Sequence, residues 1–389
     1  MSLLLIAALL PLAAWAYLLF GHGGFWRARE CDDGPAPAEP AGGWPSVAVV
    51  IPARNEADVV AQSVGSLLRQ DYEGPLRVIL VDDQSSDGTA AVAIAAAEAA
   101  GAADRLTIIA GQALPAGWTG KLWALSQGIA AAQSSAEPPE YLLLSDADIG
   151  YAADSLSRQV AIALAGGQAL VSRMAKLRCE NLPERALIPA FIFFFQMLFP
   201  FAWVNRADRR TAAGAGGCML VHRRDLEAAG GVASIRGALI DDCALAGKLK
   251  AQGPIRLELS PRVVSLRPYR SLGEIRRMVA RSAYAQLRFS PLLLLGTVAG
   301  MALHYVAPPA LAIFAHGTPR LLGAVTWLAM AASYQPTLRF YRLSPFWGLA
   351  LPAIAAMYLL FTIDSAWQHS KGRGGMWKGR AQAPGAGAL

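Results

Sequence analysis

Three clusters of aspartates are spaced along the middle of this 389-residue chain, and these residue types are well suited to chemistry. Carboxylate oxygens are hard ligands that suit Mg²⁺ or Mn²⁺, and such ions bridge the oxygens of a diphosphate. One pair of aspartates is often only a helix cap, but three clusters together favour a functional site. The clusters are Asp82-Asp83, Asp146-Ala147-Asp148 and Asp241-Asp242.

The sequence lacks the signatures of several other kinds of site. No G-x-G-x-x-G follows the first predicted strand, and Gly120-Lys121 lacks the remaining residues of a P-loop. The four cysteines form no C-x-x-C pair, and the five histidines show no zinc spacing. These observations argue against a dinucleotide fingerprint, a P-loop and a structural zinc site.

Alternating strands and helices are expected to position the aspartates. Because strand and helix alternate, the predicted fold is α/β, with a mostly parallel sheet flanked by helices. Ligands bind beyond the carboxyl ends of the strands in such sheets, and two of the aspartate clusters follow strands directly. The predicted strands are 47–51, 77–81, 106–110 and 141–145, and the predicted helices are 56–70, 87–101 and 121–133.

The rest of the chain has the composition of a membrane protein. Only 16% of all residues are charged and 54% are hydrophobic, whereas soluble domains carry about 25% charged residues. The formal charge is +7, but eight arginines fall within 256–290. A local basic excess next to apolar segments favours a juxtamembrane face over a nucleic-acid surface. The apolar segments are 3–20, 291–317, 321–334 and 346–366.

The charges that flank these segments predict their topology. The start Met-Ser-Leu-Leu-Leu lacks the basic residues that open a signal peptide, which favours an uncleaved anchor; a cleaved signal peptide is the alternative. Arg27 and Arg29 follow the first segment and favour a cytoplasmic location for the next residues. A basic tail that stays in the cytoplasm requires an even number of C-terminal crossings, and 321–334 is short for a span. The apolar run 187–204 is expected to be a helix in the membrane interface, with a buried core helix as the alternative.

The expected protein is therefore multi-pass in the inner membrane, with its catalytic domain in the cytoplasm. Its predicted order is an N-terminal transmembrane anchor (1–22), a linker (23–46), an α/β domain (47–265), a basic interface helix (266–290), C-terminal transmembrane segments (291–367) and a basic cytoplasmic tail (368–389).

Several motifs resemble those of the family 2 glycosyltransferases. The resemblance implies a GT-A fold, a nucleotide-diphosphate sugar donor, expected to be a UDP-sugar, and Mg²⁺ or Mn²⁺. The motifs are Val49-Val50-Ile51-Pro52-Ala53-Arg54-Asn55-Glu56, Val81-Asp82-Asp83-Gln84-Ser85-Ser86-Asp87-Gly88-Thr89 and Asp146-Ala147-Asp148.

Two further segments resemble the hopene-associated glycosyltransferases of bacterial hopanoid gene clusters. This closer resemblance implies a membrane lipid as the acceptor, either a hopanoid or another isoprenoid. The segments are Pro115-Ala116-Gly117-Trp118-Thr119-Gly120-Lys121 and Trp377-Lys378-Gly379-Arg380.

The family resemblance also implies a set of donor-binding residues. The glycines would let backbone N–H groups approach the sugar, although a plain turn is the alternative there. An arginine on the basic segment would bind the diphosphate or, alternatively, anionic lipid. The implied residues are Pro52, Arg54 and Glu56 beside the nucleoside, Asp83 at the base, Lys121 and Arg281 at the diphosphate, Asp146 in the D-x-D pair, Asp148 on the metal, and Gly216 and Gly217 beside the sugar.

Asp242 corresponds by this resemblance to the catalytic carboxylate. A positioned base removes the proton from an acceptor hydroxyl in the transition state, and a single base implies inversion at the anomeric carbon. Processive synthases of the family carry Q-x-x-R-W, but residues 278–282 read Met-Val-Ala-Arg-Ser. We therefore expect transfer of one sugar to a lipid; a polyprenyl-phosphate acceptor and a processive polysaccharide synthase are the alternatives.

Overall fold

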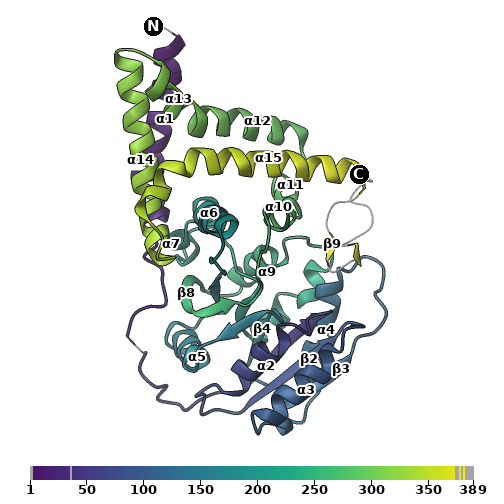
Figure 1. Ribbon diagram of the computed structural model, residues 1–389. Coiled ribbons are helices and arrows are strands. Elements are labelled where there is room, and N and C mark those ends of the chain that lie inside the picture. The colour runs from purple at the N-terminus through teal and green to yellow at the C-terminus, as the bar shows by residue number, and fades with distance from the viewer. Residues whose placement is uncertain (1–2, 36, 373–375, 378–379, 382–389) are drawn as a thin grey trace. The chain divides into compact units, whose positions relative to one another are not determined.

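The computed structural model describes residues 3–35, 37–372, 376–377 and 380–381, and it forms two compact units (Figure 1). The α/β unit comprises Glu30–Arg178, Trp203–Pro268 and the residues from Met376 onward. The helical unit comprises Met1–Arg29, Cys179–Ala202 and Tyr269–Gly375. Residues 179–202, which fall within the range 47–265 predicted for the α/β domain, belong to the helical unit.

The α/β unit contains an eight-stranded, mostly parallel sheet. Its strand order is β3-β2-β1-β4-β7-β6-β8-β5, in which only β5 and β7 run against the other six. The α/β fold predicted from the sequence is therefore confirmed. The strands are β1 (Val47–Ala53), β2 (Leu76–Asp82), β3 (Leu106–Ala110), β4 (Tyr141–Ser145), β5 (Ile149–Tyr151), β6 (Leu170–Lys176), β7 (Cys218–His222) and β8 (Ile255–Ser265).

Strand β1 lies between β2 and β4 and is buried along its whole length. Its run of β-branched residues suits a strand covered on both faces. Pro52 lacks an N–H, yet it fits here because pairing with β4 stops at Val50 while pairing with β2 continues to Ala53. Strand β1 therefore stops pairing with β4 shortly before the Arg54-Asn55-Glu56 motif, while it still pairs with β2.

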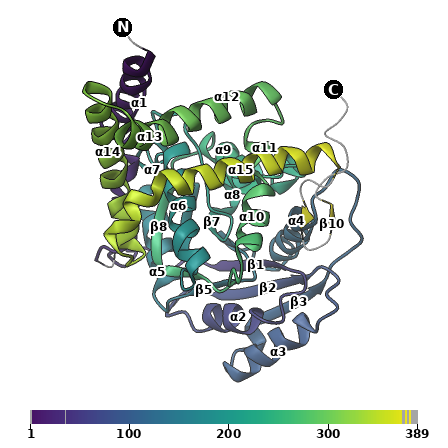
Figure 2. The same cartoon turned by 45° about the horizontal axis from the view of Figure 1, so that its top comes forward.

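Helices cover both faces of the sheet. On one face α2 and α3 pack below β1, β2 and β3 (Figure 2), and their apolar residues share one core with those strands. On the other face α4 lies so close that a Cβ on Gly128 would meet Val50 Cγ1 at 2.4 Å. The helices of this unit are α2 (Val60–Leu68), α3 (Thr89–Ala99), α4 (Gly120–Gln133), α5 (Ser155–Gly166), α8 (Arg223–Ala228) and α9 (Asp241–Lys250), with the 3₁₀ turns Ala103–Arg105 and Val232–Ile235.

Part of the predicted linker is built into the α/β unit. Asp32 is 4% exposed, and its Oδ1 lies 3.1 Å from Arg158 Nε and 3.6 Å from Arg173 Nη2. The backbone of Cys31 forms an isolated parallel β-bridge with Leu259 of β8. A buried carboxylate requires such partners, so this end of the linker is anchored by charge pairing.

The helical unit is assembled from three separate segments of the chain. Helix α6 packs among aromatic residues: Phe193 lies 5.3 Å from Phe25 and 5.2 Å from Tyr334 between ring centroids. Helices α1, α13 and α14 lie side by side (Figures 1 and 2). The elements are α1 (Leu3–Phe20), the 3₁₀ turn Phe25–Arg27, α6 (Leu182–Leu198), α10 (Leu272–Ala280), α11 (Ala283–Gln286), α12 (Pro291–Met301), the π-turn Ala302–Val306, α13 (Ala307–Phe314), α14 (Thr318–Phe340), the 3₁₀ turn Pro345–Ala350 and α15 (Leu351–Ser370).

Two segments of the chain differ from their predicted form. The run 187–204 is divided, because α6 ends at Leu198 and the short helix α7 (Phe201–Val204) begins after Pro200. Several side chains of α6 are fully buried, as the alternative of a buried core helix requires. The basic stretch 266–290 forms two short helices, α10 and α11, rather than one helix.

Among the residues that the structure describes, three helices are long and apolar enough to cross a membrane: Leu3–Phe20, Pro291–Phe314 and Pro345–Ser370. The apolar run 321–334 lies within α14, which is not among these three. Two of the candidate spans, Pro291–Phe314 and Pro345–Ser370, follow the last strand of the sheet in the sequence. The number of C-terminal crossings stays a prediction. In the tail, Met376–Trp377 and Arg380–Ala381 pair antiparallel, whereas Lys378 and Gly379 of the predicted motif lie outside the described residues.

Candidate active site

Lys121 brings two of the three aspartate clusters together. Its Nζ lies 2.8 Å from Asp146 Oδ1, beyond the end of β4, and 3.4 Å from Asp241 Oδ2 at the start of α9. Thr119 caps α4 by accepting a hydrogen bond from Leu122 N, which places Lys121 in the first turn. Burial alone would lower the pKa of Lys121, but the two carboxylates outweigh it and raise that pKa. The ammonium group therefore stays charged.

Asp242 lies beside this group and is oriented by the backbone. Its Oδ2 accepts a hydrogen bond from Gly216 N at 3.1 Å, and its Oδ1 accepts one from Cys243 N at 2.7 Å. Burial, followed by the neighbouring charge of Asp241, raises the pKa of Asp242 to about 6. A carboxyl group that titrates near neutral pH is well suited to accept a proton.

Gly216 occupies the position between Lys121 and Asp242. A Cβ at Gly216 would lie 3.1 Å from Lys121 Nζ and 3.4 Å from Asp242 Cβ. At Gly217 the carbonyl oxygen accepts hydrogen bonds from Asp146 N and Tyr151 Oη. The glycine segment therefore approaches the aspartates closely, as its predicted role requires.

Asp148 belongs to a second charged group, whose members follow the ends of β1, β4 and β8 in the sequence. Arg267 donates from Nε to Asp148 Oδ2 at 2.6 Å and from Nη2 to Glu56 Oε1 at 2.8 Å. Burial disfavours the charged form of Arg267, but Asp148 and Glu56 reverse this effect and raise its pKa. Arg267 was not predicted as a site residue, because in the sequence it is only one of several arginines in a basic segment. Its position directly after β8 was the available signal.

The two family-like motifs after β1 and β2 interlock. Asn55 N donates to Ser85 Oγ at 3.0 Å, and Ser86 N donates to Asn55 Oδ1 at 2.9 Å. Ala57 N donates to Asp87 Oδ2 at 3.0 Å. These bonds tie the two loops to each other at the carboxyl edge of the sheet.

The residues predicted to face the nucleoside lie at this same edge. Pro52 is buried in β1, and Glu56 N donates to Thr89 Oγ1 at 2.9 Å. Arg54 donates from Nη1 to the Asp83 carbonyl and lies 3.8 Å from the Asp83 carboxylate. Asp83 is 1% exposed, and its contact with a base stays a prediction.

Arg281, which is predicted to bind the diphosphate, has a structural position at the end of α10. It belongs to the helical unit, where it caps the C-terminus of α10 and donates its backbone N–H to Arg277 O. Its contact with a diphosphate stays a prediction.

The carboxylates fit a divalent metal only together with further ligands. Within the described ranges, no three His, Cys, Asp or Glu side chains come together as a complete metal site. Mg²⁺ is commonly bound by one or two carboxylates plus substrate phosphates. Asp148 and Asp146 supply such oxygens, and each of them already pairs with a cationic side chain. The donor set therefore fits a metal bound together with a diphosphate.

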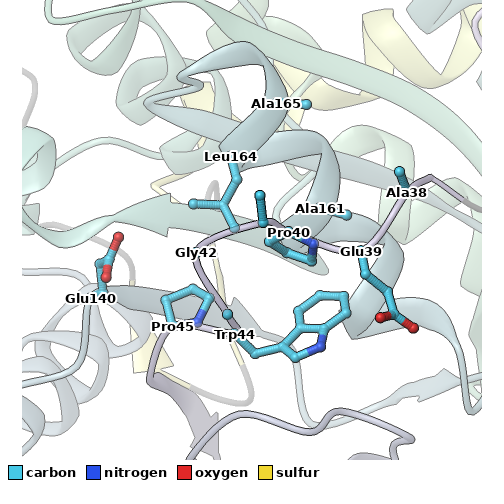
Figure 3. Close-up of a pocket in the computed structure, with 12 residues that line it drawn as sticks. Ala38, Glu39, Pro40, Gly42, Trp44, Pro45, Glu140, Ala161, Leu164 and Ala165 are labelled. Atoms are coloured by element: carbon cyan, nitrogen blue, oxygen red, sulfur yellow. The ribbon is translucent and has the colours of Figure 1, made fainter.

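A cavity of about 470 Å³ lies away from these residues. It is lined by Trp44, Pro45 and neighbouring linker residues, with Glu140 and Leu164 opposite (Figure 3). Trp44 and Glu140 precede β1 and β4, whereas the charged groups follow the carboxyl ends of these strands. The cavity is thus at the opposite edge of the sheet from the candidate active site.

Comparison with known proteins agrees with this geometry. The family model described as Glycosyl transferase family 2 matches residues 48–230. An N-acetylglucosaminyltransferase of Mesorhizobium japonicum is 41% identical over 63 residues, which is 15% of this chain and 15% of that protein. The chain therefore matches only a small part of this curated relative.

Two solved structures that align with this chain differ in how closely they match it. A mannosyltransferase from Pyrobaculum calidifontis, in complex with GDP-Man and Mn²⁺, aligns with a TM-score of 0.52 at 21% identity over 93% of this chain and 98% of that chain. A glucosyl-3-phosphoglycerate synthase from Mycobacterium tuberculosis, in complex with Mn²⁺, UDP-Glc and glycerol 3-phosphate, gives a TM-score of 0.40 at 18% identity over 67% and 87% of the two chains.

A mostly parallel sheet with helices on both faces and carboxylates beyond β2 and β4 defines the class of this unit, which is a GT-A-like α/β domain. Within that class, residues 48–230 are similar to the domains of glycosyltransferase family 2.

Proposed function

We propose that this protein is an inverting glycosyltransferase that moves one sugar from a nucleotide-diphosphate donor to a lipid in the membrane. The observation that carries the proposal is the group around Lys121, which joins Asp146 of the D-x-D pair to Asp241, next to Asp242. A donor-side cation and a proton acceptor thus lie at one carboxyl edge of the sheet, as group transfer to a hydroxyl requires.

In this proposal Asp242 accepts the proton of the acceptor hydroxyl while that oxygen attacks the anomeric carbon. Backbone N–H groups of Gly216 and Cys243 hold the carboxylate in one orientation. Displacement with a single carboxylate base inverts the anomeric centre, since retention would require a second nucleophile. Lys121 stabilises negative charge on the diphosphate side.

Asp148, with Asp146, would hold Mg²⁺ or Mn²⁺. The metal would supply charge neutralisation to the departing diphosphate. The mannosyltransferase from P. calidifontis was solved with GDP-Man and Mn²⁺, which supports a nucleotide-sugar donor and a divalent metal here. A UDP-sugar is our expected donor, with hexose or N-acetylhexosamine as the sugar.

A lipid acceptor is supported by the apolar surfaces of the helical unit. Side chains such as Leu4, Leu292 and Leu360 are exposed on the three candidate spans, and large exposed apolar surfaces mark sites of membrane or protein contact. The hopanoid-like resemblance of the sequence favours an isoprenoid acceptor. Polyprenyl phosphate is the alternative, because an arginine-rich segment is also suited to a phosphate.

Lipid mass spectrometry of cells that carry the wild type or Asp242→Asn tests this proposal. We expect the variant to lose a lipid that is heavier than its precursor by one hexose or N-acetylhexosamine. Asp104→Asn, at an exposed position away from the aspartate clusters, is the matched control and should retain the product. Identical lipid profiles in wild type and Asp242→Asn would contradict a lipid-directed activity.

The acceptor is then identified on the purified full-length protein with labelled nucleotide sugar and extracted lipid. A sugar on polyprenyl phosphate is released by mild acid, whereas a glycoside of a hopanoid alcohol resists it. A product that grows by many sugars would instead indicate a processive synthase.

A further inference from the structure

Arg267 links two segments that are far apart in the sequence. It contacts both carboxylate oxygens of Glu56, at 2.8 and 3.1 Å from Nη2, while its Nε lies 2.6 Å from Asp148 Oδ2. All three residues belong to the α/β unit. The Arg267 guanidinium group thus pairs with two carboxylates: Asp148, which is predicted to bind the metal, and Glu56, which is predicted to lie beside the nucleoside.

Strand pairing fixes the position of the Arg267 backbone next to Asp148. Strands β5 and β8 pair antiparallel, with Ile149 opposite Ser265, and Leu266 N donates to Asp148 O at 2.8 Å. Asp148 and Arg267 are therefore carried to the same place by adjacent strand ends. The Arg267 side chain is 35% exposed, compared with 16% for Asp148 and 10% for Glu56. The arginine has solvent on one side, whereas its partners are largely enclosed.

A divalent cation and this guanidinium group compete for the same carboxylate. Two cations on Asp148 would repel each other strongly in a partly buried site. A diphosphate changes this balance, because it adds negative charge and arginine binds phosphate oxygens with two parallel hydrogen bonds.

We infer that Arg267 acts as an internal cation that occupies Asp148 and Glu56 when no donor is bound, and that it releases them when metal and nucleotide diphosphate bind together. Arg267 is thus a positioning residue that couples metal binding to donor binding. This inference rests on the proposed function. Because Arg267 occupies the site, the protein should bind metal alone weakly: a site that is open only a tenth of the time binds about tenfold more weakly.

Mn²⁺ binding to the purified full-length protein, followed by the electron paramagnetic resonance signal of the free ion, tests the inference without any turnover. We expect Arg267→Met to bind Mn²⁺ about tenfold more tightly than wild type in the absence of nucleotide. Arg54→Met is the matched control: it removes one positive charge from the same edge of the sheet and leaves the Arg267–Asp148 pair intact. Asp148→Asn in the Arg267→Met background should abolish the gain.

Wild-type protein provides a second measurement that needs no variant. Adding UDP or GDP should tighten Mn²⁺ binding by about tenfold, and by reciprocity Mn²⁺ should tighten nucleotide binding equally. In Arg267→Met this coupling should shrink.

Three results would overturn the inference. These are an unchanged or weaker Mn²⁺ affinity in Arg267→Met, an equal gain in Arg54→Met, or a wild-type affinity that neither nucleotide alters. If any of these occurs while the lipid product still depends on Asp242, the proposed function stands and only the role of Arg267 falls. Loss of the lipid product itself is a separate result, scored by the lipid assay above.

Discussion

Asp242 combines two properties that a proton acceptor needs at neutral pH. Hydrogen bonds from Gly216 N and Cys243 N fix its orientation, while burial raises its pKa to about 6. The neighbouring Asp241 instead pairs with Lys121. Adjacent aspartates are thus assigned different tasks by their surroundings, one to pair with the lysine and the other to take a proton.

The pH profile of the reaction should report the titration of Asp242. A base acts in its ionised form, so kcat/KM should fall as the pH drops through about 6 and should level off above it. Initial rates with saturating metal between pH 5 and pH 8 measure this. A rate that rises toward lower pH would contradict the assignment of Asp242 as the base.

A Cβ at Gly216 should displace the Lys121 ammonium group, because it would lie 3.1 Å from Nζ, which is tighter than ordinary van der Waals contact. We expect Gly216→Ala to lower kcat by roughly 10- to 100-fold, since small displacements of reacting groups are costly. Thermal melts should show that the variant remains folded. Gly247→Ala is the matched control, because its Cβ would meet no atom within 4 Å. Equal rates in the two variants would argue against a catalytic role for the Gly216 position.

At the scale of elements, the loops after β1 and β2 behave as one unit. Asn55 takes a left-handed backbone conformation with φ of 50°, which lets its side chain accept from Ser86 N. Asp87 accepts from both Ala57 N and Thr89 N. The motifs that resemble family 2 glycosyltransferases therefore have a structural role as well as the predicted contacts with a nucleoside.

Asp87→Ala should loosen this interlock. Removal of an acceptor that serves two backbone N–H groups is expected to cost about 1–3 kcal/mol of stability and to weaken nucleotide binding. A thermal melt of the full-length protein in detergent would measure the loss of stability, and a nucleotide titration would measure the weaker binding. Asp104→Ala, at an exposed position, should change neither. Equal stability of the two variants would show that the interlock contributes nothing.

At the scale of the whole molecule, the chain leaves the helical unit after Arg29 and returns to it twice, at Cys179 and at Tyr269. Residues 179–202 leave the α/β unit and supply α6, which packs on aromatic residues of the N-terminal and C-terminal helices. Trp15 of α1 is fully buried and donates from Nε1 to His304 O at 3.0 Å. The helical unit is thus a packed assembly of three chain segments.

We expect the α/β unit to face the cytoplasm. The three candidate spans, with Arg27 and Arg29 after the first, predict that protease digests this unit in inverted inner-membrane vesicles but not in right-side-out vesicles. Immunoblotting of fragments from both preparations measures this. Digestion only in right-side-out vesicles would reverse the topology, and release of the intact protein by alkaline carbonate would contradict membrane insertion.

The sequence alone predicted the parts of this protein that depend on local order along the chain. Alternating β-branched and helical runs predicted β1 to β4 and α2 to α4, with β3 (Leu106–Ala110) and β4 (Tyr141–Ser145) at their exact bounds, but not the later strands β5 to β8. Because strand ends gather at one edge of a parallel sheet, the sequence also located the aspartates there. Long apolar runs gave the three candidate spans.

Only the tertiary structure decided which distant side chains meet. Arg267 reaches Asp148 because β8 pairs antiparallel with β5, and no periodicity in the sequence reports that pairing. The assignment of 179–202 to the helical unit likewise depends on packing between segments that are far apart in the chain. Local patterns express the preferences of neighbouring residues, whereas ion pairs and helix packing depend on how the folded chain brings remote residues into contact.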